Sequence, residues 1–146
     1  MRHSPIALCA VAAAATARPQ QTMPRHGAEV RTALDHQPLP TLDGAHVKVS
    51  VVEVRYAAGE QSAPHRHSCP VVGYIAEGAV RMRFEGGRDT VYRAGEAFYE
   101  APNRVHEVSA NASDNAPARL VATFVCDHDG ALSSPASEHA NPRAMR

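Results

Sequence analysis

The chain has 146 residues, no tryptophan and only 5% aromatic residues, so its hydrophobic core must be built mainly from aliphatic side chains. A length of this order favours one domain, and the apolar residues suffice for one small sheet protein rather than two independent cores. Lys and Arg number 15, and Asp and Glu also number 15. With this balance the chain has no excess of positive charge that would attract nucleic acid or an anionic membrane surface, so we expect no nucleic-acid partner.

The first 17 residues have the pattern of a secretory signal peptide. Arg2 gives a basic start, residues 6–17 are small or apolar, and Ala15-Thr16-Ala17 fits the small-x-small cleavage pattern. The apolar run is too short to cross a bilayer as a stable helix. We therefore predict a signal peptide at residues 1–17, a periplasmic or secreted protein, and no membrane contact after cleavage. The alternatives are a translated upstream stretch, a buried helix, or a lipoprotein signal through Cys9.

Residues 18–45 show no sustained hydrophobic period, and we predict an extended N-terminal arm there. Residues 46–51 then alternate between apolar and polar, and residues 52–56 continue the alternation after a change of phase, which suggests a bulge within the strand. The strands expected after this one are residues 71–77, 79–85, 89–93, 97–100, 106–109 and 119–126.

No amphipathic helix of ten residues stands out after the signal segment. Short strands at intervals of about ten residues, separated by glycine turns, favour an antiparallel barrel or sandwich. Residues 127–146 have no period, and we predict a flexible C-terminal tail.

Two cysteines, Cys69 and Cys126, remain after the predicted cleavage. An exported pair is able to form a disulfide. The sequence does not show whether their Cα atoms come close enough, so two separate thiols are the alternative.

Three histidines form the most informative pattern of the chain. His65 and His67 are one residue apart in a predicted strand, and His106 lies on a later strand. Alternate side chains of a strand point to the same face, so the first two imidazoles point in one direction together. Three imidazoles with vacant positions suit a divalent ion of Fe, Mn, Cu, Ni or Zn, and the ligand type alone does not choose among these metals.

The histidines and the glycines around them resemble the two sequence motifs of the cupin superfamily. The residues at motif positions are Gly59, His65, His67 and Gly78 in the first motif and Gly95 and His106 in the second. Val71 occupies the position of the first motif's glutamate, and in the second motif Ala101 and Asn103 replace the proline and the glycine. Asn103 is able to adopt the left-handed conformation that this turn needs.

This resemblance implies an all-β fold, a single-domain cupin-type double-stranded β-helix (jelly-roll barrel) over residues 46–126. It implies metal ligation by His65, His67 and His106, a small-molecule ligand or substrate, and a homodimer. Without the motif's carboxylate a divalent ion keeps a net charge of +2, which favours an anionic ligand such as an enolate, a catecholate or a carboxylate.

Other side chains around the site are open to assignment. Gln61 and Glu100 are candidate oxygen donors, whereas Glu107 follows His106 directly and should point to the opposite face of its strand. The pocket wall is expected from inward-facing residues of two strands, namely Val71, Gly73, Ile75, Met82 and Phe84. Tyr74 and Tyr99 are candidates to offer a hydroxyl group to a substrate.

Together with the predicted signal peptide, the resemblance implies an exported, metal-dependent, dioxygenase-like oxidoreductase that acts on a small anionic or enolic organic substrate. No catalytic acid or base is assigned from the sequence. The alternatives are a non-catalytic periplasmic module that binds a metal or a small ligand, and a metal-free structural cupin.

Overall fold

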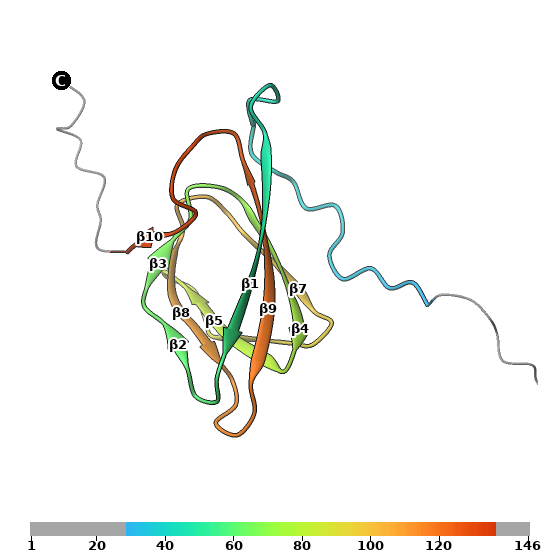
Figure 1. Cartoon of the computed structure of the whole chain (residues 1–146), viewed down its shortest axis with the longest axis vertical. Helices are drawn as coiled ribbons and strands as arrows, with labels where there is room; N and C mark the ends of the chain where they lie inside the picture. Colours follow the sequence, from blue (N-terminus) through green and yellow to red (C-terminus); the bar gives the residue numbers. More distant parts are fainter. Residues whose placement is uncertain (1–28, 137–146) are drawn as a thin grey trace, which may run out of the picture. The chain divides into compact units, whose positions relative to one another are not determined.

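The computed structural model describes residues 29–136, and all regular structure within this range is β-strand (Figure 1). The strands are β1 (Lys48–Tyr56), β2 (Gln61–Ser62), β3 (His65–Arg66), β4 (Val71–Glu77), β5 (Ala79–Phe84), β6 (Thr90–Arg93), β7 (Ala97–Glu100), β8 (Val105–Asn111), β9 (Ala118–Cys126) and β10 (Ser134–Pro135). Across this range no helix is long and apolar enough to cross a membrane. The predicted signal peptide at 1–17, residues 18–28 of the arm and residues 137–146 of the tail lie outside the described residues.

The strands form two antiparallel sheets. One sheet has the order β1-β9-β4-β7, and the other has the order β10-β3-β8-β5-β6, with β2 also paired to β8. From β3 to β9 the chain crosses repeatedly from one sheet to the other, as the ribbon in Figure 1 shows. This is the connectivity of a jelly roll, in which each sheet turns one face to the interior. The predicted all-β barrel is confirmed.

Strand β1 pairs with β9 along its whole length without a shift of register, so the predicted bulge is wrong. Val52 and Val54 point inward, whereas Val49 and Val51 point outward and are 62% and 66% exposed. Because apolar residues lie on both faces of this regular strand, the alternation of apolar and polar residues in the sequence looks as if it changed phase. The register shifts occur instead where β4 pairs with β9 and where β5 pairs with β8.

The core fills the interior between β4, β5 and β7. Ile75, Val80 and Met82 are at most 1% exposed, and burying a side chain of this size stabilises the fold by about 1.5–3 kcal/mol. Phe98 lies opposite Gly73 on the neighbouring strand, and a Cβ at residue 73 would lie 2.1 Å from its ring. The ring therefore takes the space over this glycine, and this part of the interior is closed.

The barrel extends beyond residue 126, where the sequence pattern places its end. β10 pairs with β3, and Leu132 packs against the core. Only two residues of this segment join a sheet, which is too few to give a period in the sequence. Residues 127–136 of the predicted tail thus belong to the barrel.

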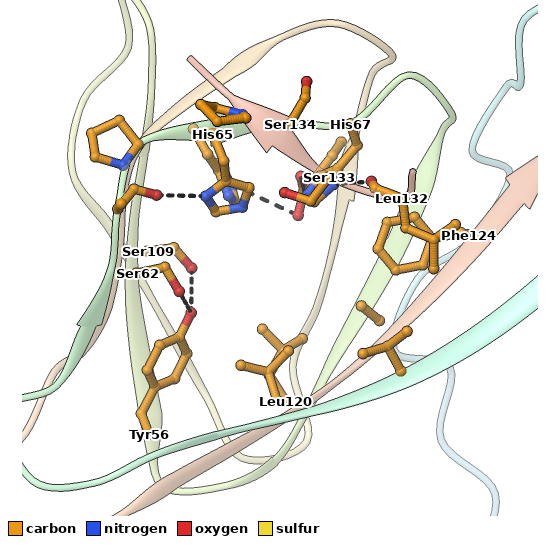
Figure 2. A pocket seen from close by; sticks show the side chains of 18 residues that line it. Tyr56, Ser62, His65, His67, Ser109, Leu120, Phe124, Leu132, Ser133 and Ser134 are labelled. Carbon is orange, nitrogen blue, oxygen red and sulfur yellow. Dashed lines mark hydrogen bonds and ion pairs between the residues drawn. The ribbon is translucent and has the colours of Figure 1, made fainter. Parts of the chain in front are cut away.

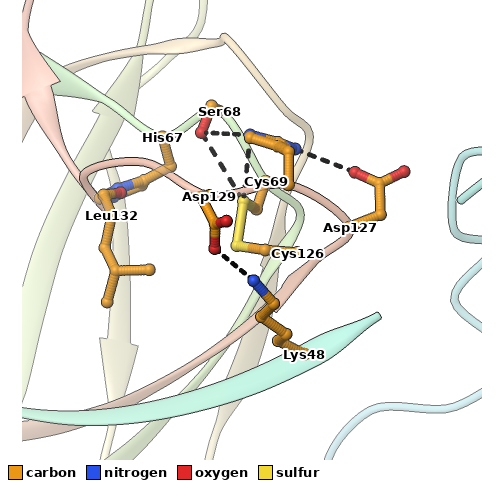
Figure 3. Close-up of a disulfide and its surroundings, with 9 residues drawn as sticks. Lys48, His67, Ser68, Cys69, Cys126, Asp127, Asp129 and Leu132 are labelled. Atoms are coloured by element: carbon orange, nitrogen blue, oxygen red, sulfur yellow. Dashed lines mark hydrogen bonds and ion pairs between the residues drawn. A yellow bond between two sulfur atoms is a disulfide. The ribbon is translucent and has the colours of Figure 1, made fainter. Parts of the chain in front are cut away.

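Cys69 and Cys126 form a disulfide, with their Cα atoms 5.1 Å apart (Figure 3). The bond joins the segment before β4 to the last residue of β9. Both sulfur-bearing side chains are buried. The sequence leaves open whether these cysteines form a disulfide or two separate thiols, and in the structure they form the disulfide.

Candidate metal centre

The three predicted histidines converge in the interior of the barrel. His65 on β3 and His106 on β8 are direct cross-strand partners, so their side chains stand next to each other on one face. His67 follows β3 and points the same way (Figure 2). One ring nitrogen from each residue lies within 4.8 Å of the others. Ligand atoms about 2.0–2.1 Å from one ion are about 3–3.5 Å apart, so the three ring nitrogens would move closer together to hold a metal.

Backbone carbonyls fix the orientation of two of these imidazoles. Nδ1 of His65 donates to the carbonyl oxygen of Ala63 at 2.8 Å, and Nδ1 of His67 donates to that of Leu132 at 2.7 Å. A carbonyl oxygen only accepts, so Nδ1 carries a proton in both rings, and in the neutral form of each ring Nε2 keeps its lone pair. This is the outer-shell arrangement that orients metal-ligating histidines.

The third imidazole, that of His106, is buried without a hydrogen bond. The side chain is 1% exposed, and among the described residues neither ring nitrogen has a hydrogen-bond partner. Burial, followed by the neighbouring histidines and Arg104, lowers its pKa to about 3, so the ring is neutral. An unpaired buried polar group costs about 1–3 kcal/mol. A metal ion bound by one of these nitrogens would satisfy it, so the residues present fit a metal.

Glu100 brings a carboxyl group to the same place. It is the cross-strand partner of Val71, the residue at the position of the missing motif glutamate. Its Oε2 lies 3.5 Å from Nε2 of His67, and its Oε1 lies 3.8 Å from Nε2 of His106. The carboxyl group that β4 lacks thus comes from β7, one strand further along the sheet.

Burial sets the charge state of this carboxyl group. Desolvation raises the pKa of Glu100 to about 8, and desolvation is also the main reason why the pKa of His67 is lowered. The burial effects on both partners thus favour uncharged forms, so we treat the contacts of Glu100 with His67 and His106 as contacts between neutral groups rather than ion pairs. A divalent ion among them would bind the ionised carboxylate.

The two other candidate oxygen donors lie elsewhere. Gln61 is exposed and does not line the interior cavity. Glu107 accepts a hydrogen bond from Nε of Arg83 at 3.0 Å, on the opposite face of β8 from His106. Asn103 has a φ of 62° and adopts the left-handed conformation expected of it, with its N–H bonded to the carbonyl oxygen of His67.

A cavity of about 520 Å³ opens beside the histidines and Glu100 (Figure 2). Its apolar walls are formed mainly by β1 and β9, through Val52, Val54, Leu120, Ala122 and Phe124. The pocket wall predicted on β4 and β5 is wrong, because those side chains pack with Phe98 in the closed core or lie outside the cavity lining. The reading of the sequence also missed the tyrosine that does line the cavity, Tyr56, which shares the inward parity of Val52 and Val54. Tyr74 is exposed, and neither it nor Tyr99 lines the cavity.

Comparison with known proteins agrees with this architecture. Residues 52–124, half of the chain, match the family model described as Cupin domain. No curated protein matches the sequence closely enough to count as a relative.

Several solved structures share the fold. An oxalate oxidase in complex with the substrate analogue glycolate has 24% sequence identity and a TM-score of 0.51, and the match covers 59% of this chain and 45% of that one. The DMSP lyase DddQ from Ruegeria pomeroyi has 16% identity and a TM-score of 0.53, with 60% and 42% covered. A cupin-like protein from Thermotoga maritima has 17% identity and a TM-score of 0.52, with 59% and 62% covered. The matched region thus spans less than half the length of the oxidase and of the lyase. On the strength of the family match and this shared fold, the chain belongs to the cupin family.

Proposed function

We propose that this protein is an exported small cupin that holds one divalent metal ion through His65, His67, His106 and Glu100. We further propose that it is a dioxygenase-like oxidoreductase whose substrate is a small organic molecule with an anionic or enolic oxygen. The observation that carries the metal site is His106, which is buried with neither ring nitrogen bonded among the described residues. The nearby Glu100 supplies the negatively charged ligand that the sequence motif lacks.

The charge of this centre favours an anionic ligand. Three neutral imidazoles and one carboxylate leave a divalent ion with a net charge of +1. Because the surrounding cavity wall is mainly apolar, that charge is poorly screened and attracts an enolate, catecholate or carboxylate oxygen. A redox-active ion such as Fe, Mn, Cu or Ni would supply electron-transfer chemistry here. The solved neighbours include an oxidase and a lyase, so the fold is compatible with enzymes of both kinds.

Metal analysis of the purified protein tests the proposal. Protein prepared without chelator, or reconstituted with Fe²⁺, Mn²⁺, Cu²⁺, Ni²⁺ or Zn²⁺, should hold about one ion per chain. His65→Ala and His106→Ala should lose it, whereas His46→Ala, which changes an exposed histidine, should keep it. O₂ uptake with enolic acids should follow the metal content.

The outcomes separate the candidate functions. Stoichiometric metal without turnover on such substrates would favour a non-catalytic binding module. Absence of metal after reconstitution would overturn the metal centre and favour a structural cupin.

Export is a second part of the proposal. The disulfide between Cys69 and Cys126 supports it, because such bonds persist in oxidising compartments. Mass spectrometry of the protein from the native cell should show a mature chain that begins at Arg18 and a disulfide that is intact. A chain that retains residues 1–17 would contradict export by signal-peptide cleavage.

We also propose that the protein forms a homodimer through the outer face of the β1-β9-β4-β7 sheet. Val49, Val51 and Tyr74 expose apolar surface there, and β1 is an edge strand in the described part of the chain. Light scattering should give a dimer that Val51→Glu weakens. Thr90→Glu, an exposed change on the other sheet, should leave the dimer intact. A monomeric wild type would refute this proposal.

A further inference from the structure

Three hydroxyl groups from different strands meet at one side of the cavity. Ser62 on β2 and Ser109 on β8 are cross-strand partners. Tyr56, the last residue of β1, reaches both with its hydroxyl group, at 2.8 Å from Oγ of Ser62 and 2.9 Å from Oγ of Ser109. All three residues line the cavity (Figure 2). The sheet register thus gathers a compact polar cluster, here called the hydroxyl cluster, in a cavity whose walls are mainly apolar.

The cluster keeps hydrogen-bonding capacity for a ligand. Each hydroxyl group has one proton to donate and lone pairs to accept with. Three protons are available, and the two bonds between Tyr56 and the serines use two of them. Since no other hydrogen bond of these hydroxyl groups occurs among the described residues, one O–H is left to donate, and lone pairs remain to accept.

The rest of the cavity limits what such a ligand is. The main apolar side chains of the walls are Val52, Val54, Leu120, Ala122 and Phe124, and Ser133 and Ser134 also line the cavity. Among the described residues that line the cavity, none is Lys or Arg. Away from the metal centre a second carboxylate or a phosphate group would therefore lack a countercharge, and burying it would be costly. A neutral hydroxyl or carbonyl group would be paired by the hydroxyl cluster at no such cost.

The volume of the cavity also favours a ligand with an apolar body. A cavity of about 520 Å³ falls in the range of sites that enclose a whole organic ligand, roughly 300–1,000 Å³. It is far more space than a two-carbon acid fills. An apolar body of one ring or a short chain would bury the surface of the walls.

We propose that Tyr56, Ser62 and Ser109 form a second binding subsite, which selects substrates that carry a neutral hydroxyl or carbonyl group at the end of an apolar body. The acidic or enolic oxygen at the other end of the same molecule lies at the histidines and Glu100. This inference rests on the proposed function and narrows its substrate class to hydroxylated or carbonyl-bearing monoacids.

Binding of simple aromatic acids tests the subsite. The probes are benzoate and phenylacetate, each compared with its 3-hydroxy and 4-hydroxy derivatives, and the measurement is Kd by calorimetry on Zn²⁺-loaded protein. At least one hydroxylated acid should bind about fivefold to tenfold more tightly than its parent, the effect expected of one net hydrogen bond. Tyr56→Phe and Ser109→Ala should each reduce this preference, measured for every variant as the ratio of the Kd of the parent acid to the Kd of its hydroxylated derivative. Tyr92→Phe, a change outside the cavity lining, should keep the preference.

The result distinguishes failure of the subsite from failure of the function. If the Zn²⁺-loaded wild type binds the parent acids but shows no preference for any hydroxylated acid, the subsite is wrong and the metal centre stands. The subsite is also wrong if both variants keep the full preference while thermal unfolding shows them folded. If the protein takes up no metal, both the function and the subsite are overturned. Two variants on different strands guard against one of them failing to fold.

Discussion

Replacing His106 by leucine should stabilise the metal-free protein. The imidazole of His106 is buried, neutral and without a hydrogen bond among the described residues, beside the ring of Phe84 at 4.2 Å between centroids. Leucine has similar bulk and no polar atom. The substitution therefore removes an unpaired polar group without opening a cavity, and the gain at pH 7 should be about 1–3 kcal/mol. In a domain of this size each kcal/mol raises Tm by about 4–8 °C.

The gain should also depend on pH. In the unfolded chain His106 takes up a proton near its ordinary pKa of 6.5, whereas in the folded metal-free protein its pKa is about 3. Below pH 6.5 the unfolded state of the wild type thus binds more protons than the native state. The free energy of unfolding of the wild type therefore decreases as the pH is lowered. The leucine variant lacks this loss. Its advantage should widen by up to about 1.4 kcal/mol for each pH unit between 6.5 and 3.

Metal should reverse the order of stability. A metal at 1,000 times its Kd adds about 4.1 kcal/mol to a protein that binds it only when folded, which exceeds the advantage of about 1–3 kcal/mol expected for the leucine variant. The wild type should gain this and the His106→Leu variant should gain much less. Chemical denaturation of metal-free and Zn²⁺-loaded samples from pH 4 to 7 measures all three effects, with His46→Leu as the control at an exposed histidine. A metal-free leucine variant that is less stable than the wild type, or a gap that does not change with pH, would refute the reasoning.

Three further predictions follow from the same geometry. Since the pKa of Glu100 is about 8, Zn²⁺ binding at pH 7 should release about 0.9 proton from this group. Calorimetry in buffers of different ionisation enthalpy measures this release, and Glu100→Gln should abolish it. Leu132→Ala should lower metal affinity by up to about tenfold in a chelator competition, because the leucine side chain packs on the core and thereby positions the backbone carbonyl oxygen that accepts the proton of His67 Nδ1. Replacing Cys69 and Cys126 together by alanine should cost about 4 kcal/mol in urea unfolding, since their bond closes a loop with a sequence separation of 57.

The strands were predictable from the sequence because their alternation and glycine turns are local signals. The fold class was confirmed, whereas the bulge in β1 and the end of the barrel at residue 126 were not. Both differences have the same origin. The alternation of apolar and polar residues along a strand indicates which residues are buried only where a single face of the strand is apolar. Val49 and Val51 break that condition by facing outward, and β10 is too short to show a period.

The candidate site divides in the same way between local and long-range information. His65 and His67 could be placed on one face from their spacing alone. The partnership of Val71 with Glu100 depends on the pairing of β4 with β7, which no local pattern encodes. For this reason the sequence left Glu100 as one of two open candidates. Tyr56 was missed because its role depends on two serines from other strands.

The carboxyl group near the histidines lies on β7, whereas the sequence motif would place it on β4. This difference determines which strand metal binding would stabilise. His65 and His106 belong to one sheet, and Glu100 is the last residue of β7, a four-residue strand at the end of the other sheet. Short strands at an edge open more readily than central ones because they have fewer neighbours. A metal held by both sheets would therefore stabilise β7, an edge strand, against opening. In the metal-free state Glu100 and His106 are buried and uncharged, and His106 has no hydrogen-bond partner among the described residues, which costs the fold stability. A structural barrel without a metal would gain from an apolar residue at position 106, and the presence of histidine there is best explained by a ligand that binds it.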